Sequence, residues 1–159
     1  TEYGLNLTLG YKNVIKNTNI KVNYTRVANR TYNTPDPSEK YIYKNLPIGH
    51  NLGNNFWETS VTLSYRMENK LIADLSAVYR EYGDEALYSP FNSDFVKFPA
   101  GEYKEAFPFG SVNKQSGMAL RIFYQLNTKM LINAKTSFWL EQGNLEEDFN
   151  YFVGVGYRM

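Results

Sequence analysis

The chain contains a single histidine, His50, and histidine is the side chain best suited to proton transfer near neutral pH. As a catalytic base, His50 would need a nucleophile and an orienting carboxylate, and a lone histidine supplies neither. As a metal ligand it has no His or Cys companion, and no Asp or Glu partner is marked. We therefore expect His50 to hydrogen-bond within its own loop, where Gly49 and Gly53 permit tight backbone turns. We therefore predict from the sequence that the protein is not an enzyme and that it binds neither a cofactor nor a metal ion.

Aromatic residues are frequent in two long segments, and their rings could stack on the apolar C–H faces of sugars. Asn, Asp and Glu side chains in the same segments can bind sugar hydroxyls. The candidate glycan-binding residues are Tyr41, Tyr43, His50, Asn54, Tyr88, Phe91, Asp94 and Tyr103. For any one of these residues, packing of the loops on one another is the favoured alternative, and both interpretations stay open.

The composition excludes several classes of protein. Seventeen basic residues face 16 acidic ones, so nothing in the charge suggests a nucleic-acid partner. The absence of cysteine removes disulfides and thiolate metal sites. No apolar run approaches the roughly 18 residues that a membrane-spanning helix needs. The first residues are not a signal peptide and already resemble a strand, as though the chain were entered part-way.

Apolar and polar side chains alternate in seven segments, which predicts seven β-strands with one apolar and one polar face. The segments cover residues 3–11, 20–26, 57–67, 71–80, 117–126, 130–141 and 150–159. No stretch with helical spacing competes with them. Arg26 falls among the apolar positions of the second segment, so that strand either leaves the apolar surroundings there or contains a bulge.

Three features favour a membrane barrel over a soluble barrel, whose apolar face would point inward. The strands run to about ten residues or more, enough to cross a bilayer at a tilt, whereas soluble strands average roughly five or six. Aromatic residues lie near both ends of the apolar stripes, as in the two girdles of outer-membrane barrels. Short turns near residues 13–18, 68–70 and 127–129 alternate with long connections at 31–54 and 83–113.

The predicted fold is all-β: residues 1–159 form the C-terminal seven strands of one antiparallel transmembrane β-barrel domain. Single-chain bacterial barrels normally have an even strand number, and an open edge at residues 2–12 would leave unpaired backbone in lipid. We therefore expect further strands upstream or in another chain. All three tight turns lie on the side of Met159, which places the C-terminus in the periplasm and the long loops outside. The last strand resembles the C-terminal signature of such barrels, although it ends in Met159 and has Tyr157 two places earlier.

Charged residues at the polar positions of the strands would face the barrel lumen. They are Glu58, Arg66, Asp74, Arg80, Arg121, Lys135, Glu141 and Arg158. In a wide barrel they could line an aqueous path, and in a narrow or plugged barrel they form paired networks. Their mixed sign favours pairing. The acidic run at residues 146–148 lacks the alternating pattern of a calcium loop and is expected to be solvated surface.

The stretch from Tyr41 to Glu58 is the most distinctive in the chain, with Gly49-His50-Asn51-Leu52-Gly53-Asn54-Asn55 at its centre. It resembles the Tyr-rich, Gly-His-containing segment of the capsule-assembly Wzi family, and is more similar still to related barrel proteins of gliding Bacteroidetes. The runs at residues 30–33 and 90–94 fit the same pattern. The resemblance implies a large barrel of about eighteen strands whose outer face binds surface polysaccharide.

The leading hypothesis is a non-enzymatic barrel of the bacterial outer membrane that binds or organises surface polysaccharide, in capsule assembly or gliding-associated adhesion. The alternative is a porin, or an accessory barrel subunit of a larger outer-membrane secretion or assembly complex. An outer-membrane lipase or acyltransferase would need a Ser–His pair at the lipid boundary, and no serine is marked for that role. The expected partners are outer-membrane lipid, surface polysaccharide and other outer-membrane proteins.

Overall fold

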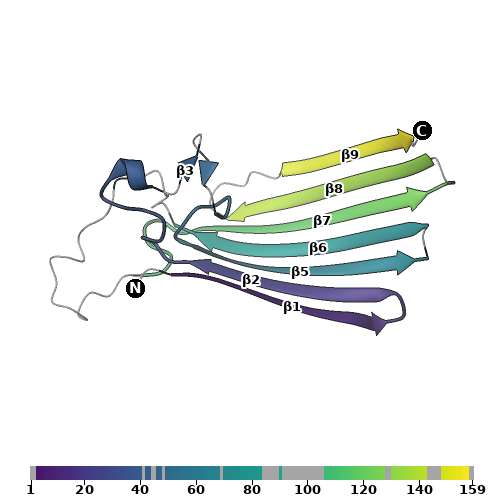
Figure 1. Ribbon diagram of the computed structural model, residues 1–159, viewed down its shortest axis with the longest axis horizontal. Helices are drawn as coiled ribbons and strands as arrows, with labels where there is room; N and C mark the ends of the chain where they lie inside the picture. Colours follow the sequence, from purple (N-terminus) through teal and green to yellow (C-terminus); the bar gives the residue numbers. More distant parts are fainter. Residues whose placement is uncertain are drawn as a thin grey trace. The chain divides into compact units, whose positions relative to one another are not determined.

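A computed structural model shows an all-β chain organised around one antiparallel sheet of seven strands (Figure 1). The structure describes residues 3–40, 42–43, 46–47, 49–68, 70–83, 90, 106–127, 130–142 and 148–157. The strands of the sheet, in spatial order, are β1 (Gly4–Ile15), β2 (Thr18–Val27), β5 (Phe56–Met67), β6 (Leu71–Tyr82), β7 (Asn113–Gln125), β8 (Met130–Gln142) and β9 (Asp148–Tyr157). All seven predicted strands are present, so the antiparallel all-β fold is confirmed.

The sheet does not close over the part of the chain that the structure describes, because β1 and β9 are its two ends. The barrel and its strand number therefore stay predictions. The long connection between β2 and β5 contains a small separate sheet, in which β3 (Ile42–Tyr43) pairs antiparallel with β4 (Leu46–Pro47).

The same connection contains one turn of 3-10 helix, η1 (Pro37–Glu39), which the alternation pattern did not predict. Asp36 precedes it, and the Asp36 carboxylate accepts hydrogen bonds from the backbone N–H and the hydroxyl of Ser38, each at 2.8 Å. These hydrogen bonds lower the pKa of Asp36. The helix begins here because Asp is a good N-cap and proline is tolerated in a first turn. No helix in the described ranges is long and apolar enough to span a membrane.

The tight turns depend on residues that tolerate a left-handed backbone. Asn17 has φ of 66° between β1 and β2, and Glu68 has φ of 47° after β5. Asn13 also has a positive φ, of 56°, and its N–H donates to Asn19 Oδ1 at 3.1 Å. β1 nonetheless continues through Asn13 to Ile15, beyond the end that the sequence predicted. After β7, the Asn127 side chain accepts a hydrogen bond from Met130 N at 2.9 Å. Asn is suited to these positions because its short polar side chain stabilises the left-handed region.

The contacts divide the chain into two compact units. The first comprises Thr1–Asn6, Thr25–Glu58 and Arg80–Lys114 and contains the bases of the long loops. The second comprises Leu7–Tyr24, Thr59–Tyr79 and Gln115–Met159 and contains the tight turns. Among the residues with described burial, the buried apolar side chains are Val27, Phe56 and Pro108, all in the first unit.

In the second unit, apolar side chains at alternate strand positions are exposed. Leu9 is 75% exposed, Tyr11 67%, Tyr151 79% and Val153 69%. Apolar residues of the central strands, such as Leu75 at 41%, share this exposure. One face of this part of the sheet is therefore apolar and uncovered.

At the polar positions of the second unit, two charged side chains form an ion pair, and a tryptophan ring packs closely on a glycine. Arg121 Nη2 lies 2.8 Å from Asp74 Oδ2 and forms an ion pair with it. A Cβ added at Gly117 would lie 2.6 Å from Trp139 Cε3, so only glycine leaves room for the indole ring. In the β8–β9 pair, Lys135 lies opposite Phe152.

Candidate functional site

His50 lies in a tight turn at the base of the loop that precedes β5. The His50 carbonyl accepts a hydrogen bond from Gly53 N at 2.8 Å, and its Nδ1 accepts one from Leu52 N at 3.2 Å. Gly53 has φ of 74°, as its predicted turn role requires. At Gly49 a Cβ would lie 3.3 Å from the Tyr32 ring, a tight approach that a small shift of the exposed ring would relieve. The hydrogen bonding of His50 within its own loop is thus as predicted.

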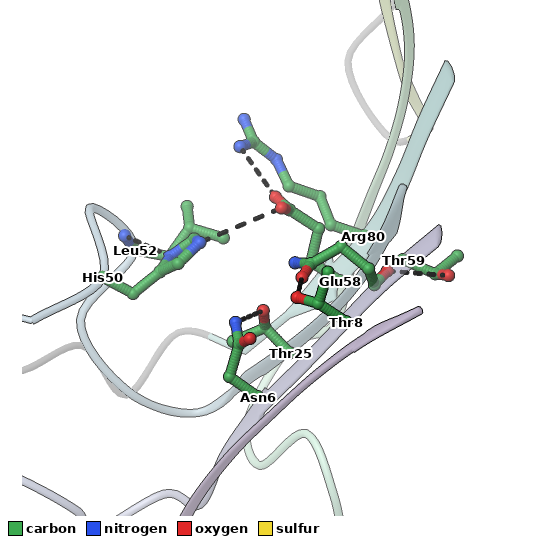
Figure 2. Close-up of polar contacts among 9 residues, drawn as sticks. Asn6, Thr8, Thr25, His50, Leu52, Glu58, Thr59 and Arg80 are labelled. Carbon is green, nitrogen blue, oxygen red and sulfur yellow. Dashed lines mark hydrogen bonds and ion pairs between the residues drawn. The ribbon is translucent and has the colours of Figure 1, made fainter. Parts of the chain in front are cut away.

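The far side of the His50 ring faces charged residues of β5 and β6 (Figure 2). Because Nδ1 accepts the Leu52 hydrogen bond, Nε2 carries the proton of the neutral imidazole. Nε2 lies 3.9 Å from Glu58 Oε1, and Glu58 Oε2 lies 3.8 Å from Arg80 Nη1. The side chains are 25% exposed for His50, 16% for Glu58 and 17% for Arg80, so solvent still reaches all three. We call these three residues the His50 cluster.

The neutral form of His50 is favoured in the folded chain. Its ring packs on Phe56 with 4.4 Å between centroids, and burial lowers its pKa from the ordinary 6.5. The Glu58 carboxylate opposes this shift, and the Arg80 guanidinium adds to it. An imidazole, a carboxylate and a guanidinium together can donate to and accept from hydroxyl groups, and the guanidinium can also bind a carboxylate.

This shift predicts that the loop base loses stability in acid. The folded state binds the His50 proton less readily than the unfolded state, so the contribution is complete above about pH 6.5 and falls as the pH drops below it. Proteolysis of the loop between β2 and β5 at pH 7.5 and pH 5 should show faster cleavage in acid. In a His50→Gln variant, the difference between the cleavage rates at pH 7.5 and pH 5 should be smaller. Asp36 should titrate only at lower pH, since its pKa lies below 3.8. Equal acid sensitivity in both proteins would contradict the role of His50.

Asn55 joins three segments at the loop bases. It is fully buried, with φ of 58°. Its side-chain amide donates to Phe109 O at 2.8 Å, and its Oδ1 accepts from Phe109 N at 2.7 Å. The Asn55 carbonyl accepts from Gly83 N at 3.0 Å, and a Cβ at Gly83 would lie 1.8 Å from Phe109 O. We call Asn55, Gly83 and Phe109 the Asn55 bridge. Sequence reasoning missed it.

Arg26 sits at the end of β2 among aromatic rings. Its guanidinium lies 4.0 Å from the centroid of Phe107 and 5.7 Å from that of Tyr3. Cation–π contacts of this kind stabilise a partly buried arginine. The exception noticed in the alternation pattern is therefore explained by the strand ending at Val27, among the loop bases.

The structure places only part of the predicted glycan-binding set. Asn54 is 3% exposed and its side-chain amide donates to Asn29 O, so it stabilises the loop base from inside. The Tyr43 backbone belongs to β3. His50 lies in its turn, as described above, and the other five predicted residues lie outside the described ranges: Tyr41, Tyr88, Phe91, Asp94 and Tyr103.

Several of the predicted lumen charges form ion pairs. Glu58 pairs with Arg80, and Asp74 pairs with Arg121. Of the other four, Arg66 and Lys135 are exposed, Glu141 is half-buried and has an interaction partner of its own, and Arg158 lies outside the described ranges. Pairing within the described part thus agrees with the mixed sign of these charges. Their position toward a lumen stays a prediction.

No group of three or more His, Cys, Asp or Glu side chains that could hold a metal ion occurs among the described residues. Comparisons of the chain with family models, curated proteins and solved structures found no match. The residues and their geometry therefore carry the functional argument.

Proposed function

We propose that this chain is part of an outer-membrane β-barrel whose apolar face contacts lipid and whose outer loops bind or organise surface polysaccharide. The observation that carries the proposal is the uncovered apolar face of the sheet, on which Leu9, Tyr11 and Val153 are 67–75% exposed. Soluble monomers rarely expose apolar patches beyond a few hundred Å². In a bilayer, lipid would cover this face, and its apolar side chains would not be exposed to water.

Strand length and edges support the same proposal. The seven strands contain 10 to 13 residues, and roughly 9–11 tilted residues cross a bilayer. In lipid an open sheet edge is prohibitive, because its backbone groups have no partners. Further strands, from this protein or another chain, would therefore pair with β1 and β9. The long loops would then face outward and the tight turns the periplasm.

The polysaccharide part of the proposal is supported by the His50 cluster and by the resemblance of residues 41–58 to capsule-assembly barrels. Glu58 and Arg80 offer an acceptor and a donor beside a partly exposed imidazole. Sugars present hydroxyls, and acidic sugars present carboxylates, which match these groups. The aromatic residues of the long loops would add ring-stacking surfaces.

Binding of the purified full-length protein, in detergent or nanodiscs, to the organism's own surface polysaccharide tests the proposal. We expect binding by the wild type and weaker binding by Glu58→Gln, which removes the charge held between His50 and Arg80. Glu39→Gln, in η1, is the matched control, since it removes a loop carboxylate outside the cluster. No binding by a correctly folded wild type would overturn the polysaccharide role.

A porin or an accessory subunit of a larger outer-membrane complex is the second candidate. The exposed β1 strand favours the accessory role, because its edge away from β2 is a ready template for pairing with another chain. Ion conductance in planar bilayers would support a porin. Stable co-purification with other outer-membrane proteins would support the accessory role.

A further inference from the structure

The polar face of the second unit contains an open hollow beside the tight turns of β5–β6 and β7–β8. Its volume is about 350 Å³, near the lower end of the roughly 300–1,000 Å³ typical of ligand sites. Its lining includes Arg66, Glu68, Lys70, Phe123, Gln125 and Leu131. The hollow belongs to the second unit, whereas the His50 cluster belongs to the first.

Arg66 and Lys70, the cations of this hollow, differ from the nearby Arg121 on the same face. Arg121 is neutralised by Asp74 at 2.8 Å and lies 5.3 Å from the centroid of Phe123. Arg66 and Lys70 lie within ion-pair distance of no carboxylate of the described residues, and Arg66 interacts electrostatically with Asp74 only over a longer distance. Glu68 is the one carboxylate in the lining, so two cations and one anion leave the hollow with a net positive charge.

We propose that this hollow binds a hexuronate unit of an acidic oligosaccharide. Arg66 and Lys70 bind the carboxylate, in a charge-assisted contact. The Phe123 ring provides a surface for the C–H face of the sugar. Gln125 and Glu68 hydrogen-bond the hydroxyls. The single negative charge of a hexuronate balances the net positive charge of the hollow, and Glu68 would repel a more highly charged ligand such as a phosphate.

The choice of a sugar over other carboxylates rests on the proposed polysaccharide function, and in the proposed orientation this hollow would meet the polysaccharide at the periplasmic end of the barrel, away from the outer loops. The hollow itself does not, because its charge and its aromatic wall are features of β5 to β8. An acidic peptide is the alternative ligand that the test must exclude.

Isothermal titration of the purified full-length protein with a trimer of galacturonic acid tests the site. We expect binding that weakens as salt rises, since exposed charges are screened. A neutral galactose trimer and a glutamate tripeptide should bind at least about tenfold more weakly, because each lacks either the carboxylate or the sugar face. Equal or tighter binding of the peptide would overturn the sugar assignment.

Variants locate the binding. Arg66→Gln and Lys70→Gln should each weaken the galacturonate trimer about tenfold, the effect of losing one charge-assisted hydrogen bond. Lys135→Gln is the matched control, because Lys135 is an exposed cation of β8 outside the lining. The affinity of this variant for the galacturonate trimer should stay within about twofold of the wild type. Equal affinity in all three variants would overturn the site.

A measurement on the unmutated protein covers the case in which the variants do not fold. Acetylation of lysines, read by mass spectrometry, should show protection of Lys70 by the galacturonate trimer and none of Lys135. Unprotected Lys70 under saturating ligand would overturn the proposal. Suppose that the organism's polysaccharide binds the wild type more tightly than Glu58→Gln, while the trimer does not protect Lys70. The proposed sugar site in the hollow would then be wrong, and the proposed function of the outer loops would stand. If neither glycan binds, both proposals fail.

Discussion

Replacing Asn55 with alanine should lower the free energy of unfolding by about 3–5 kcal/mol. The change removes the two part-buried hydrogen bonds to Phe109 N–H and Phe109 C=O, at a cost of about 1–1.5 kcal/mol each. It also places alanine at φ of 58°, where the left-handed backbone costs roughly 1–2 kcal/mol. Denaturant unfolding of the full-length protein measures the loss. Faster proteolysis between residues 83 and 106 would show that the loop base has opened.

Two further variants separate the hydrogen bonds of Asn55 from its backbone conformation. Asn55→Gly relieves the backbone strain but removes the hydrogen bonds to Phe109, so it should still show most of the loss in unfolding free energy expected for Asn55→Ala. Asn13→Ala is the matched control, because Asn13 is exposed and has a similar φ of 56°. It should cost only about 1–2 kcal/mol. If Asn55→Ala cost no more than Asn13→Ala, the bridge would contribute nothing to stability.

Replacing Leu75 with arginine should cost about 2–4 kcal/mol in a lipid bilayer, the penalty for a cation on the lipid face near the midplane. Leu75 is in the middle of the apolar positions of β6 and is 41% exposed. If that face were in water, the same change would lie within about 0.5 kcal/mol of neutral, as most surface substitutions do. Reversible unfolding in phospholipid vesicles measures the difference.

Leu126→Arg is the matched control for depth. Leu126 is also an exposed leucine, at 50%, but it lies at the tight turn after β7. Near the membrane interface an arginine costs only about 0–1 kcal/mol. A large loss for Leu75→Arg with a small loss for Leu126→Arg would establish the membrane depth of the sheet. Two small and equal losses would place the apolar face in water.

The strands could be predicted from the sequence because alternation is a local property of each segment. The boundaries were less certain where alternation fades. β7 begins at Asn113, four residues before the predicted start, because the strand continues where polar Lys114 and Ser116 occupy the positions of the apolar series. β1 continues past its predicted end to Ile15, through Asn13 with its positive φ, which no alternation pattern marks.

The local part of the site could also be predicted, and the long-range part could not. The hydrogen bond of His50 spans two residues, within reach of turn chemistry. The Asn55 bridge spans 54 residues and uses backbone atoms of Phe109, which any residue possesses, so no side-chain pattern marks it. The stacking of Arg26 on Phe107 likewise depends on the path of a loop, although its unusual position in β2 was visible.

The Asn55 bridge also has a consequence for how this protein can change during evolution. It holds Gly83 and Phe109 at neighbouring points, so the chain between them leaves and returns at almost one place. Once the ends of a segment are fixed, closing it costs only roughly 0.6 kcal/mol more for each doubling of its length. Insertions and deletions between residues 84 and 105 should therefore be tolerated far better than any change at Asn55 or Gly83. We expect related chains to keep these two anchors while the length and sequence of the segment between them diverge.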